Sequence, residues 1–504
     1  MDHTNGPRLL AIAVDAAEPT FVQQLIERAD MPALGSLLNA GKWLRVKSPA
    51  DIASASVWPT FISGESPKAH GFYGEWLWDA STMSLSRWDG GNISPFWKEL
   101  LEQGVSVGVL DVPFMPLLGV SNGFEISEWG AHDVVAARTR LAPDSIASIV
   151  GEHSPHPLEA RFEVSGPEDY AGLERVGDIC LRGITARGNL SRALIAETKP
   201  QLALLGFTEI HHASHYLWHK VEPEHPAYSD SALNQLATTR PDMREIYKEL
   251  DKQIGELVSV VGTETSVMVF SLHGMRPARG SPAFLAPWLC ERGFARFKNW
   301  RNQSWSERAK SSFATLKRHA PASAKKLYYR AMPANVTFQL ASPTMLPRYD
   351  WANTTAFSLP TDQHGWIRVN LMGREAQGIV PPGSYDDICQ QLESDLRGLR
   401  SQRGEVLVHD VIRTALHVDS AMSQRLPDIV VHWTDEVFAA PLVIAGSKVK
   451  AESIGKKYVG QHSLEGFCIL RSAQEIDSDH LCAQDMHILF NRLLHPLSLS
   501  AGTF

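Results

Sequence analysis

A histidine-rich segment has the spacing that points most directly to metal chemistry. Residues 209–219 hold four histidines within nine positions, and His211 and His215 stand four residues apart. On a helix those two rings share one face, as chelation of a metal ion requires. His219 continues the same stripe and His212 points elsewhere, so two or three of the four can serve one ion. The segment directly follows an apolar run, which favours a metal site over the alternative of surface or core histidines.

A second segment, residues 50–64, offers hydroxyl groups that could attack an ester. Ser54 and Ser56 lie in a turn rich in small residues, and Thr60 follows within an amphipathic helical pattern. A nucleophilic oxygen in this turn would lie near a helix N-terminus, where backbone N–H groups favour an anion. A serine in such a place can also be an ordinary N-cap, so both interpretations stay open at this point.

Other polar residues stand just after apolar runs. Asp15 and His273 each follow such a run closely, and His462 lies in a segment bounded by glycines at Gly460 and Gly466. Open parallel sheets bind ligands outside the carboxyl ends of their strands. We therefore expect these side chains to meet the histidine-rich segment at one edge of a sheet.

The elements that must position these residues alternate along the chain. Continuous apolar runs predict buried strands at Leu9–Val14, Gly104–Leu110, Leu202–Phe207 and Val267–Phe270, and a helical pattern covers Pro19 to Arg28. Strand and helix in alternation predict an α/β fold, with a mostly parallel central sheet and helices on both faces.

One segment, residues 281–345, breaks this alternation. Between Glu291 and Arg330 it carries eleven Lys or Arg residues against two Glu. We predict a basic, largely helical cap inserted into an α/β core of residues 1–280 and 346–504. The cap is either a solvated helical surface or a lid whose cations meet an anionic substrate. Alternation resumes with apolar runs at residues 367–371 and 428–433.

Composition narrows the class of protein. The 504 residues carry 48 Lys or Arg against 56 Asp or Glu, which gives a formal charge of −8. This charge argues against sequence-independent binding of nucleic acid. Five cysteines without a C-x-x-C spacing fit a reducing cytoplasm. No apolar run approaches the ~18 residues of a membrane span, so we expect a soluble protein. The oligomeric state cannot be inferred from the sequence.

Taken in order, these motifs resemble the alkaline phosphatase superfamily, specifically its type I phosphodiesterase/nucleotide pyrophosphatase branch. The resemblance spans nearly the whole chain apart from the basic segment, and it implies an alkaline-phosphatase-like fold and ester hydrolysis. It is carried by Asp15, residues 54–64, the pair His211 and His215, residues 271–275 and residues 460–466, with weaker echoes at residues 111–113, 370–375 and 426–430.

The resemblance also implies roles for single residues. In that branch a Ser or Thr before a glycine coordinates a metal and attacks phosphorus, and counting back ten residues from Gly64 reaches Ser54. Ser56 is the competitor and Thr60 a weaker one. One ion would be held by Asp15, Ser54 and His273, which we call the aspartate site. The other would be held by His211, His215 and His462, which we call the histidine site.

This sequence departs from the family pattern at two metal ligands. His211 stands where the branch has the aspartate of a D-x-x-x-H pair, and Leu272 stands where it has the aspartate before the histidine of S-D-H-G. The histidine site, with an open fourth position, suits zinc, although another divalent metal such as Mn²⁺ is an alternative. Because the aspartate site is one carboxylate short, the sequence leaves open whether one or two ions bind.

The leading functional prediction is a metal-dependent hydrolase of a phosphodiester or phosphomonoester that acts through the metal-bound Ser54. A small anionic ester is the expected partner. Sulfate or phosphonate esters are the nearest chemical alternatives. Two further alternatives remain: a single-zinc hydrolase or transferase of small-molecule metabolism, and a binding member of the family that has lost catalysis.

Overall fold

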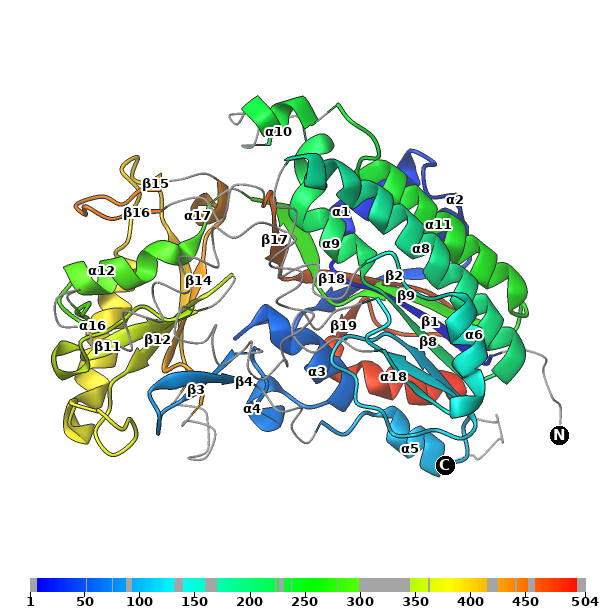
Figure 1. The fold of residues 1–504 in the computed structure, drawn as a ribbon, viewed down its shortest axis with the longest axis horizontal. Helices are drawn as coiled ribbons and strands as arrows, with labels where there is room; N and C mark the ends of the chain where they lie inside the picture. Colours follow the sequence, from blue (N-terminus) through cyan, green and yellow to red (C-terminus); the bar gives the residue numbers. More distant parts are fainter. Residues whose placement is uncertain are drawn as a thin grey trace.

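The computed structural model has two main sheets, of nine and four strands, with separate apolar cores, as Figure 1 shows. We call the larger sheet with its helices the large lobe, and the four-stranded sheet with helices α12 (Leu285–Glu291) and α16 (Tyr385–Arg397) the small lobe. The described residues are 7–50, 52–74, 76–87, 93–130, 139–158, 170–222, 224–225, 231–236, 238–278, 280–298, 345–360, 363–414, 425–439, 442–451 and 458–495.

The large lobe is built on a nine-stranded sheet of order β19-β2-β18-β9-β1-β8-β5-β6-β7. Strands β9, β1, β8, β5 and β6 run parallel, while β18 and β7 are antiparallel to their neighbours. The sheet confirms the predicted α/β fold with a mostly parallel centre. Its strands are β1 Leu9–Val14, β2 Lys42–Lys47, β5 Val107–Leu110, β6 Gly123–Ser127, β7 Arg140–Ala142, β8 Leu202–Phe207, β9 Ser266–Ser271, β18 Glu465–Arg471 and β19 His480–Cys482.

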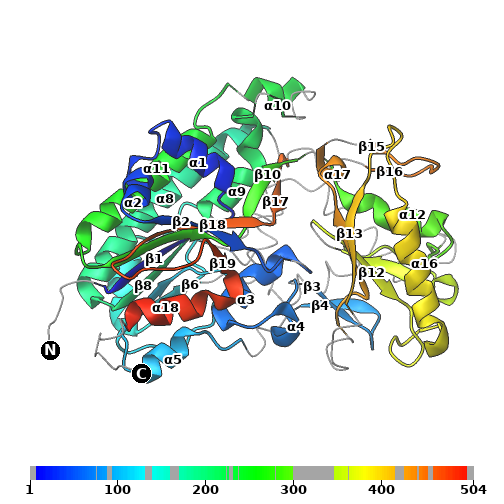
Figure 2. The same cartoon turned by 180° about the vertical axis from the view of Figure 1, so that it is seen from behind.

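Helices cover both faces of this sheet, as Figure 2 shows from behind. Successive side chains of a strand point to opposite faces, so Leu10 and Ile12 of β1 pack into one apolar cluster and Leu9 and Ala11 into the other. One face is covered by α1 Pro19–Glu27, α2 Pro32–Asn39, α8 Tyr170–Thr198, α9 Glu209–Leu217 and α11 Met243–Val260. The other is covered by α3 Val57–Ser63, α5 Trp97–Glu102 and α18 Met486–Leu494.

The small lobe differs from the predicted continuation of the parallel sheet. Its strands β11 (Ala356–Leu359), β12 (Gly365–Val369), β14 (Ile429–Trp433) and β13 (Val408–Arg413) form a separate, wholly antiparallel sheet in that order. The two apolar runs predicted to resume the alternation, at residues 367–371 and 428–433, lie largely in β12 and β14, which are antiparallel neighbours. An apolar run reports that a strand is buried but carries no information on the direction of its neighbour.

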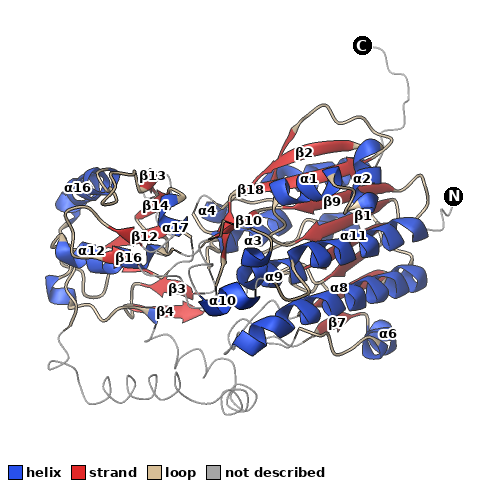
Figure 3. Ribbon diagram, turned by 90° about the horizontal axis from the view of Figure 1, so that it is seen from above, coloured by secondary structure: helices blue, strands red, loops and turns tan. Residues whose placement is uncertain are grey.

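A hairpin from the N-terminal part of the chain packs against the small lobe, and Figure 3 shows it from above beside β12. It consists of β3 (Trp76–Asp79) and β4 (Ser84–Arg87). Trp78 Nε1 donates to Glu375 Oε2 at 2.8 Å, and Glu375 also pairs with Arg368 and Arg374. Arg374 in turn binds Asp428 at 2.6 Å. This buried ion network ties residues far apart in sequence into one core.

The basic segment is only partly described. Residues 299–344 lie outside the described residues, so the predicted cap over 281–345 stays a prediction there. The flanking residues Leu285–Lys298 and Tyr349–Leu359 contribute side chains to the apolar core of the small lobe. Within the described part of the chain, no helix is long and apolar enough to cross a membrane.

Candidate metal centre

Three histidines from distant parts of the sequence converge at the carboxyl end of the large sheet. Helix α9 begins directly after β8 and carries His211 and His215 one turn apart. His462 lies on β17 (Gly460–Ser463), which pairs antiparallel with β10 (Gly274–Pro277) just beyond the end of β9. The potential ligand atoms of the three rings all lie within 4.8 Å of one another.

The spacing of the three rings matches a tetrahedral ion. His211 Nε2 lies 2.9 Å from His215 Nε2 and 3.2 Å from His462 Nε2. With zinc–nitrogen bonds of about 2.0 to 2.1 Å, two ligands of a tetrahedral ion stand about 3.3 Å apart. The residues of the histidine site therefore fit a divalent ion with little movement.

Outer hydrogen bonds orient two of these rings. His211 Nδ1 lies 2.7 Å from Asp15 Oδ2, and His215 Nδ1 lies 3.2 Å from the Gly460 carbonyl oxygen. A carboxylate and a carbonyl only accept, so each Nδ1 is the N–H donor, and in the neutral form of each ring, which metal binding requires, Nε2 turns its lone pair towards the other rings. This arrangement is typical of metal-binding histidines, whose outer nitrogen donates to a carboxylate or carbonyl.

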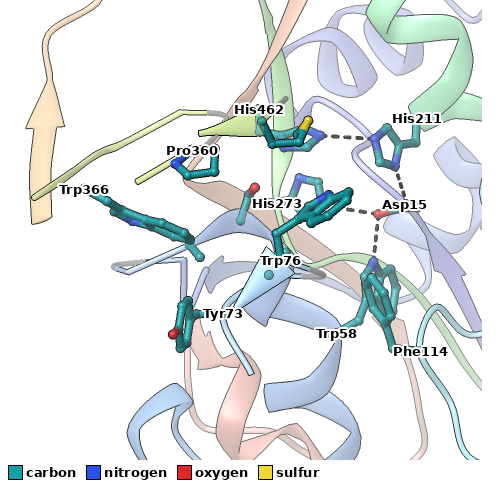
Figure 4. Close-up of a pocket in the computed structure, with 15 residues that line it drawn as sticks. Asp15, Trp58, Tyr73, Trp76, Phe114, His211, His273, Pro360, Trp366 and His462 are labelled. Atoms are coloured by element: carbon teal, nitrogen blue, oxygen red, sulfur yellow. Dashed lines mark hydrogen bonds and ion pairs between the residues drawn. The ribbon is translucent and has the colours of Figure 1, made fainter. Parts of the chain in front are cut away.

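Asp15 stands at the end of β1 and is buried, with 1% of its surface exposed. Its Oδ1 accepts from Trp58 Nε1 at 2.9 Å and lies 3.2 Å from His273 Nε2. Figure 4 shows Asp15 at the meeting point of the contacts from Trp58, His273 and His211. Burial by itself would raise the pKa of Asp15, but the neighbouring His211 and His273 rings outweigh it and hold that pKa well below its usual value.

The hydroxyl groups of the serine segment are placed differently from one another. Ser54 begins a short 3-10 turn before α3 and lines the same cavity as Asp15 and the histidines. Ser56 is fully buried outside that lining, and its Oγ donates to the Ala53 carbonyl at 2.6 Å. Thr60 Oγ1 is hydrogen-bonded to His70 Nε2 at 2.9 Å. Of the three candidate nucleophiles, only Ser54 faces the cavity.

The cavity has a volume of about 370 Å³ and two contrasting sides. Its polar side is formed by Asp15, Ser54, His211, His273 and His462. Its other side is largely aromatic and apolar and is formed by Tyr73, Trp76, Pro360 and Trp366. Trp58 and Phe114 are also aromatic but lie beside Asp15, as Figure 4 shows, and Met345 completes the apolar residues of the described lining. None of these apolar residues was a candidate from the sequence, because a large apolar side chain gives the same pattern whether it lines a core or a cavity.

Comparison with known proteins identifies the family. The model of the family "Type I phosphodiesterase / nucleotide pyrophosphatase" matches residues 9–440. The chain belongs to the type I phosphodiesterase/nucleotide pyrophosphatase family. The predicted resemblance is thereby confirmed, and with it the prediction of an ester hydrolase of the alkaline phosphatase superfamily. Members of this family are metalloenzymes.

Solved structures match the chain at low sequence identity, and the one protein among them with TM-scores above 0.5 shares its fold. Phosphonoacetate hydrolase from Sinorhizobium meliloti 1021 matches with 14% identity and a TM-score of 0.52 in its complex with phosphonoformate, covering 97% of this chain and 96% of that one. Its complex with phosphonoacetate gives 13% identity and 0.53 over the same shares. Murine ectonucleotide pyrophosphatase/phosphodiesterase 5 with AMP gives 11% identity and 0.46 over 99% and 97%. No curated protein sequence matches the chain.

The other two histidines of this chain's histidine-rich segment, His212 and His219, do not reach the centre. His219 was expected to continue the stripe, but the α-helix ends at Leu217 and a tighter 3-10 turn over Trp218–Lys220 changes the rotation per residue. Among the described residues, the metal-ligand grouping contains neither His219 nor His212. Both are fully buried within the large lobe.

A buried ion network anchors the start of α9, and sequence reasoning missed it. Arg187 on α8 donates from Nε to Glu209 Oε1 and from Nη1 to Asp111 Oδ2, each at 2.8 Å. His156 Nε2 lies 2.9 Å from the same Glu209 oxygen. Burial would raise the pKa of Glu209, but Arg187 and His156 lower it to about 2. These ion pairs fix the start of α9, the helix that carries His211. The one sequence signal for them was the resemblance to the family at residues 111–113.

Proposed function

We propose that this family member is a metal-dependent hydrolase of phosphodiester or phosphomonoester substrates, with Ser54 as the nucleophile. The observation that carries the proposal is the shared cavity. Ser54 and two of the histidines with inward-facing nitrogens line one space of about 370 Å³, which is large enough for a small ester.

His211, His215 and His462 would hold the divalent ion, and their three imidazole nitrogens favour zinc over oxygen-preferring metals such as Mn²⁺. When bound, the ion would supply Lewis-acid polarisation of a phosphoryl oxygen and would lower the pKa of a hydroxyl group close to it. The ligand geometry and the outer partners of His211 and His215 support this assignment.

The chain's own part in the reaction follows from the position of Ser54. Its Oγ attacks phosphorus in line with the leaving group, so an Oγ–P bond forms as the bond from phosphorus to the leaving oxygen breaks. The electron pair leaves with that oxygen, and the hydroxyl proton passes to solvent. Water then attacks phosphorus from the opposite side, the Oγ–P bond breaks, and Oγ regains a proton.

The aromatic side of the cavity favours an ester with a flat, apolar group. Trp76 and Trp366 offer ring surfaces for stacking, and none of the described residues that line the cavity is a lysine or an arginine. A second carboxylate or phosphate on the substrate would therefore find no fixed cation in this lining. We accordingly propose a diester with one aryl-like arm in preference to a small dianion such as phosphonoacetate.

A substrate screen tests this proposal. Zinc-loaded protein should hydrolyse bis-p-nitrophenyl phosphate faster than p-nitrophenyl phosphate or p-nitrophenyl sulfate. Ser54→Ala should remove turnover, and Ser56→Ala is the matched control that should retain it. Faster cleavage of the sulfate ester would replace the proposed substrate class. No cleavage of any ester would support a binding member that has lost catalysis.

A cytoplasmic location is part of the proposal and is supported by the cysteines. All five lie among the described residues, and none forms a disulfide.

A further inference from the structure

The aspartate site of the family pattern does not fit an ion in this chain. Its missing carboxylate is replaced by Leu272, which is completely buried. Leu272 belongs to the same apolar cluster as Trp58 and Phe61, on the face of the sheet covered by α3. A leucine offers no ligand atom, so the site has lost a charged donor and gained a hydrophobic contact.

The remaining carboxylate of that site already accepts hydrogen bonds on both of its oxygens, from His211 and Trp58, and the His273 ring lies beside it. Oδ2 of Asp15 faces His211 Nδ1 at 2.7 Å, and Oδ1 faces Trp58 Nε1 at 2.9 Å and His273 Nε2 at 3.2 Å. An indole nitrogen is only a donor and cannot ligate a metal. The histidine site contrasts with this arrangement, because there nitrogen lone pairs face each other across the space an ion would fill.

Charge gives an independent argument. Asp15 is the one carboxylate among the described residues that line the cavity. The other acids nearby are committed elsewhere: Glu18 Oε2 accepts from Met275 N and Ser463 Oγ, and Glu209 pairs with Arg187. Two divalent cations held against one buried carboxylate would leave a large uncompensated charge in a low-dielectric site. A single ion leaves only one excess positive charge, which an anionic substrate can neutralise.

We infer that this chain binds one divalent ion, in the histidine site, and that Asp15 acts as the hydrogen-bond partner of His211 instead of as a metal ligand. Trp58, which donates to Oδ1, holds the carboxylate in that role. Asp15 is then a positioning residue that orients the His211 ring and raises the basicity of its Nε2. This inference goes beyond the proposed function, because it concerns the number of ions and does not depend on which ester is cleaved.

Metal content decides between one ion and two. Purified protein dialysed against a small excess of Zn²⁺ should retain one zinc per chain by inductively coupled plasma mass spectrometry, and calorimetric titration of the stripped protein should show one tight site. Two tightly held ions in the wild type would overturn the inference. Because neither readout uses turnover, an inactive protein with one zinc would refute the proposed function and leave the inference intact.

Variants of Asp15 separate its two possible roles. An outer hydrogen-bond partner typically contributes about 10- to 100-fold to metal affinity. Asp15→Asn keeps an acceptor oxygen for His211 and should weaken zinc binding modestly, Asp15→Ala should weaken it by about 10- to 100-fold, and both should still bind one ion. The visible spectrum of the Co²⁺-substituted variants should remain that of a four-coordinate ion. Loss of a whole equivalent of metal in Asp15→Asn would instead show that Asp15 is a ligand.

Leu272 provides the converse test. Leu272→Asp should create a second, weaker binding step, whereas the uncharged Leu272→Asn should not, because only the carboxylate supplies charge to the aspartate site. Unchanged binding of one ion by a folded Leu272→Asp protein would contradict the role given to this position. Because a buried aspartate can prevent folding, the thermal melting curve is recorded first, and the wild-type ion count remains decisive.

Discussion

The two lobes contribute different side chains to the cavity they share. The large lobe supplies every polar residue of the described lining, namely Asp15, Ser54 and the histidines, together with the apolar Trp58 and Phe114, whereas Tyr73, Trp76 and Trp366 pack in the apolar core of the small lobe. We call the polar lining residues the polar wall, and Tyr73, Trp76 and Trp366 the apolar wall. The polar wall is positioned by the large, mostly parallel sheet, and the apolar wall by an antiparallel sheet with a separate core. Reaction chemistry and substrate choice are therefore assigned to different lobes.

The two walls are nevertheless joined at the serine segment. Trp366 Nε1 donates to the Ile52 carbonyl at 2.8 Å, and His364 Nε2 donates to the Ala50 carbonyl at 2.6 Å. Both carbonyls belong to the turn that leads to Ser54. The small lobe thus contributes to the position of the proposed nucleophile as well as to the apolar wall. At this one place, we expect a change in the small lobe to affect the reaction as well as substrate binding.

The largest expected effect lies on the polar wall. His215→Ala removes one of three nitrogens from the histidine site, so the variant should lose tight zinc binding, and turnover should fall by at least ~10³-fold because the ion is the main source of charge stabilisation. His212→Gln, on the same helix but outside the metal grouping, is the control. Equal losses in both variants, at matched melting temperatures, would remove the basis for the histidine site.

The second effect concerns the stability of the small lobe. Burial opposes ionisation of Asp428, but Arg374 outweighs it and lowers the pKa of this carboxyl below its usual value. The stabilisation should be present above pH ~4, the unfolded pKa, and should be lost as pH falls through the lower folded pKa. Asp428→Asn should cost about 3 kcal/mol, because it removes one of the two buried carboxylates that pair with Arg374.

Thermal unfolding between pH 7 and pH 3 measures this effect. The wild type should lose stability below pH ~4 more steeply than Asp428→Asn, while zinc affinity at pH 7 should be the same in both proteins. A fall in zinc affinity in the folded variant would show that the two lobes are more strongly coupled than this division allows.

A smaller effect is expected where the walls are joined. Trp366→Phe keeps an aromatic ring but leaves the buried Ile52 carbonyl without its donor, at a cost of about 1 to 3 kcal/mol. If the small lobe holds the serine turn, kcat should fall by about 10-fold with little change in KM. A rise in KM alone would assign Trp366 to the apolar wall only.

The smallest effect is expected at Trp76, which touches the cavity from the hairpin. Trp76→Ala should raise KM for bis-p-nitrophenyl phosphate by about 2- to 12-fold, the equivalent of ~0.5 to 1.5 kcal/mol of aromatic contact, and should leave kcat and zinc affinity unchanged. Methyl p-nitrophenyl phosphate, with only one aryl arm, should show a smaller change. An equal change for both esters would argue against stacking on this wall.

The sequence reveals the polar wall far better than the apolar one. The i and i+4 spacing of His211 and His215, and the position of Asp15 after an apolar run, predict both the elements and the edge of the sheet where these residues meet. Trp76 and Trp366 could not be found in this way, because a tryptophan is equally suited to a core and a cavity. The antiparallel pairing of β12 with β14 could not be predicted from the sequence pattern either, since it depends on contacts between residues more than sixty positions apart, such as Ile367 and Ile429.

The Trp58–Asp15 hydrogen bond could not be predicted from the sequence pattern for a similar reason. Trp58 lies on α3, a short helix that is buried over nearly its whole length, so its surroundings are those of a core residue. Only the folded chain shows that its one polar atom faces the Asp15 carboxylate. The sequence leaves the number of metal ions open, and this contact is what favours one.

The most direct test of the whole account is the dependence of turnover on zinc. Metal-free protein at micromolar concentration is titrated with Zn²⁺, and hydrolysis of bis-p-nitrophenyl phosphate is followed at each addition, with Ser54→Ala titrated in parallel. We predict that activity rises linearly and stops rising at one zinc per chain, and that Ser54→Ala binds the same single equivalent without turnover. Activity that requires a second equivalent, or that persists in Ser54→Ala, would contradict a one-ion centre serving a serine nucleophile.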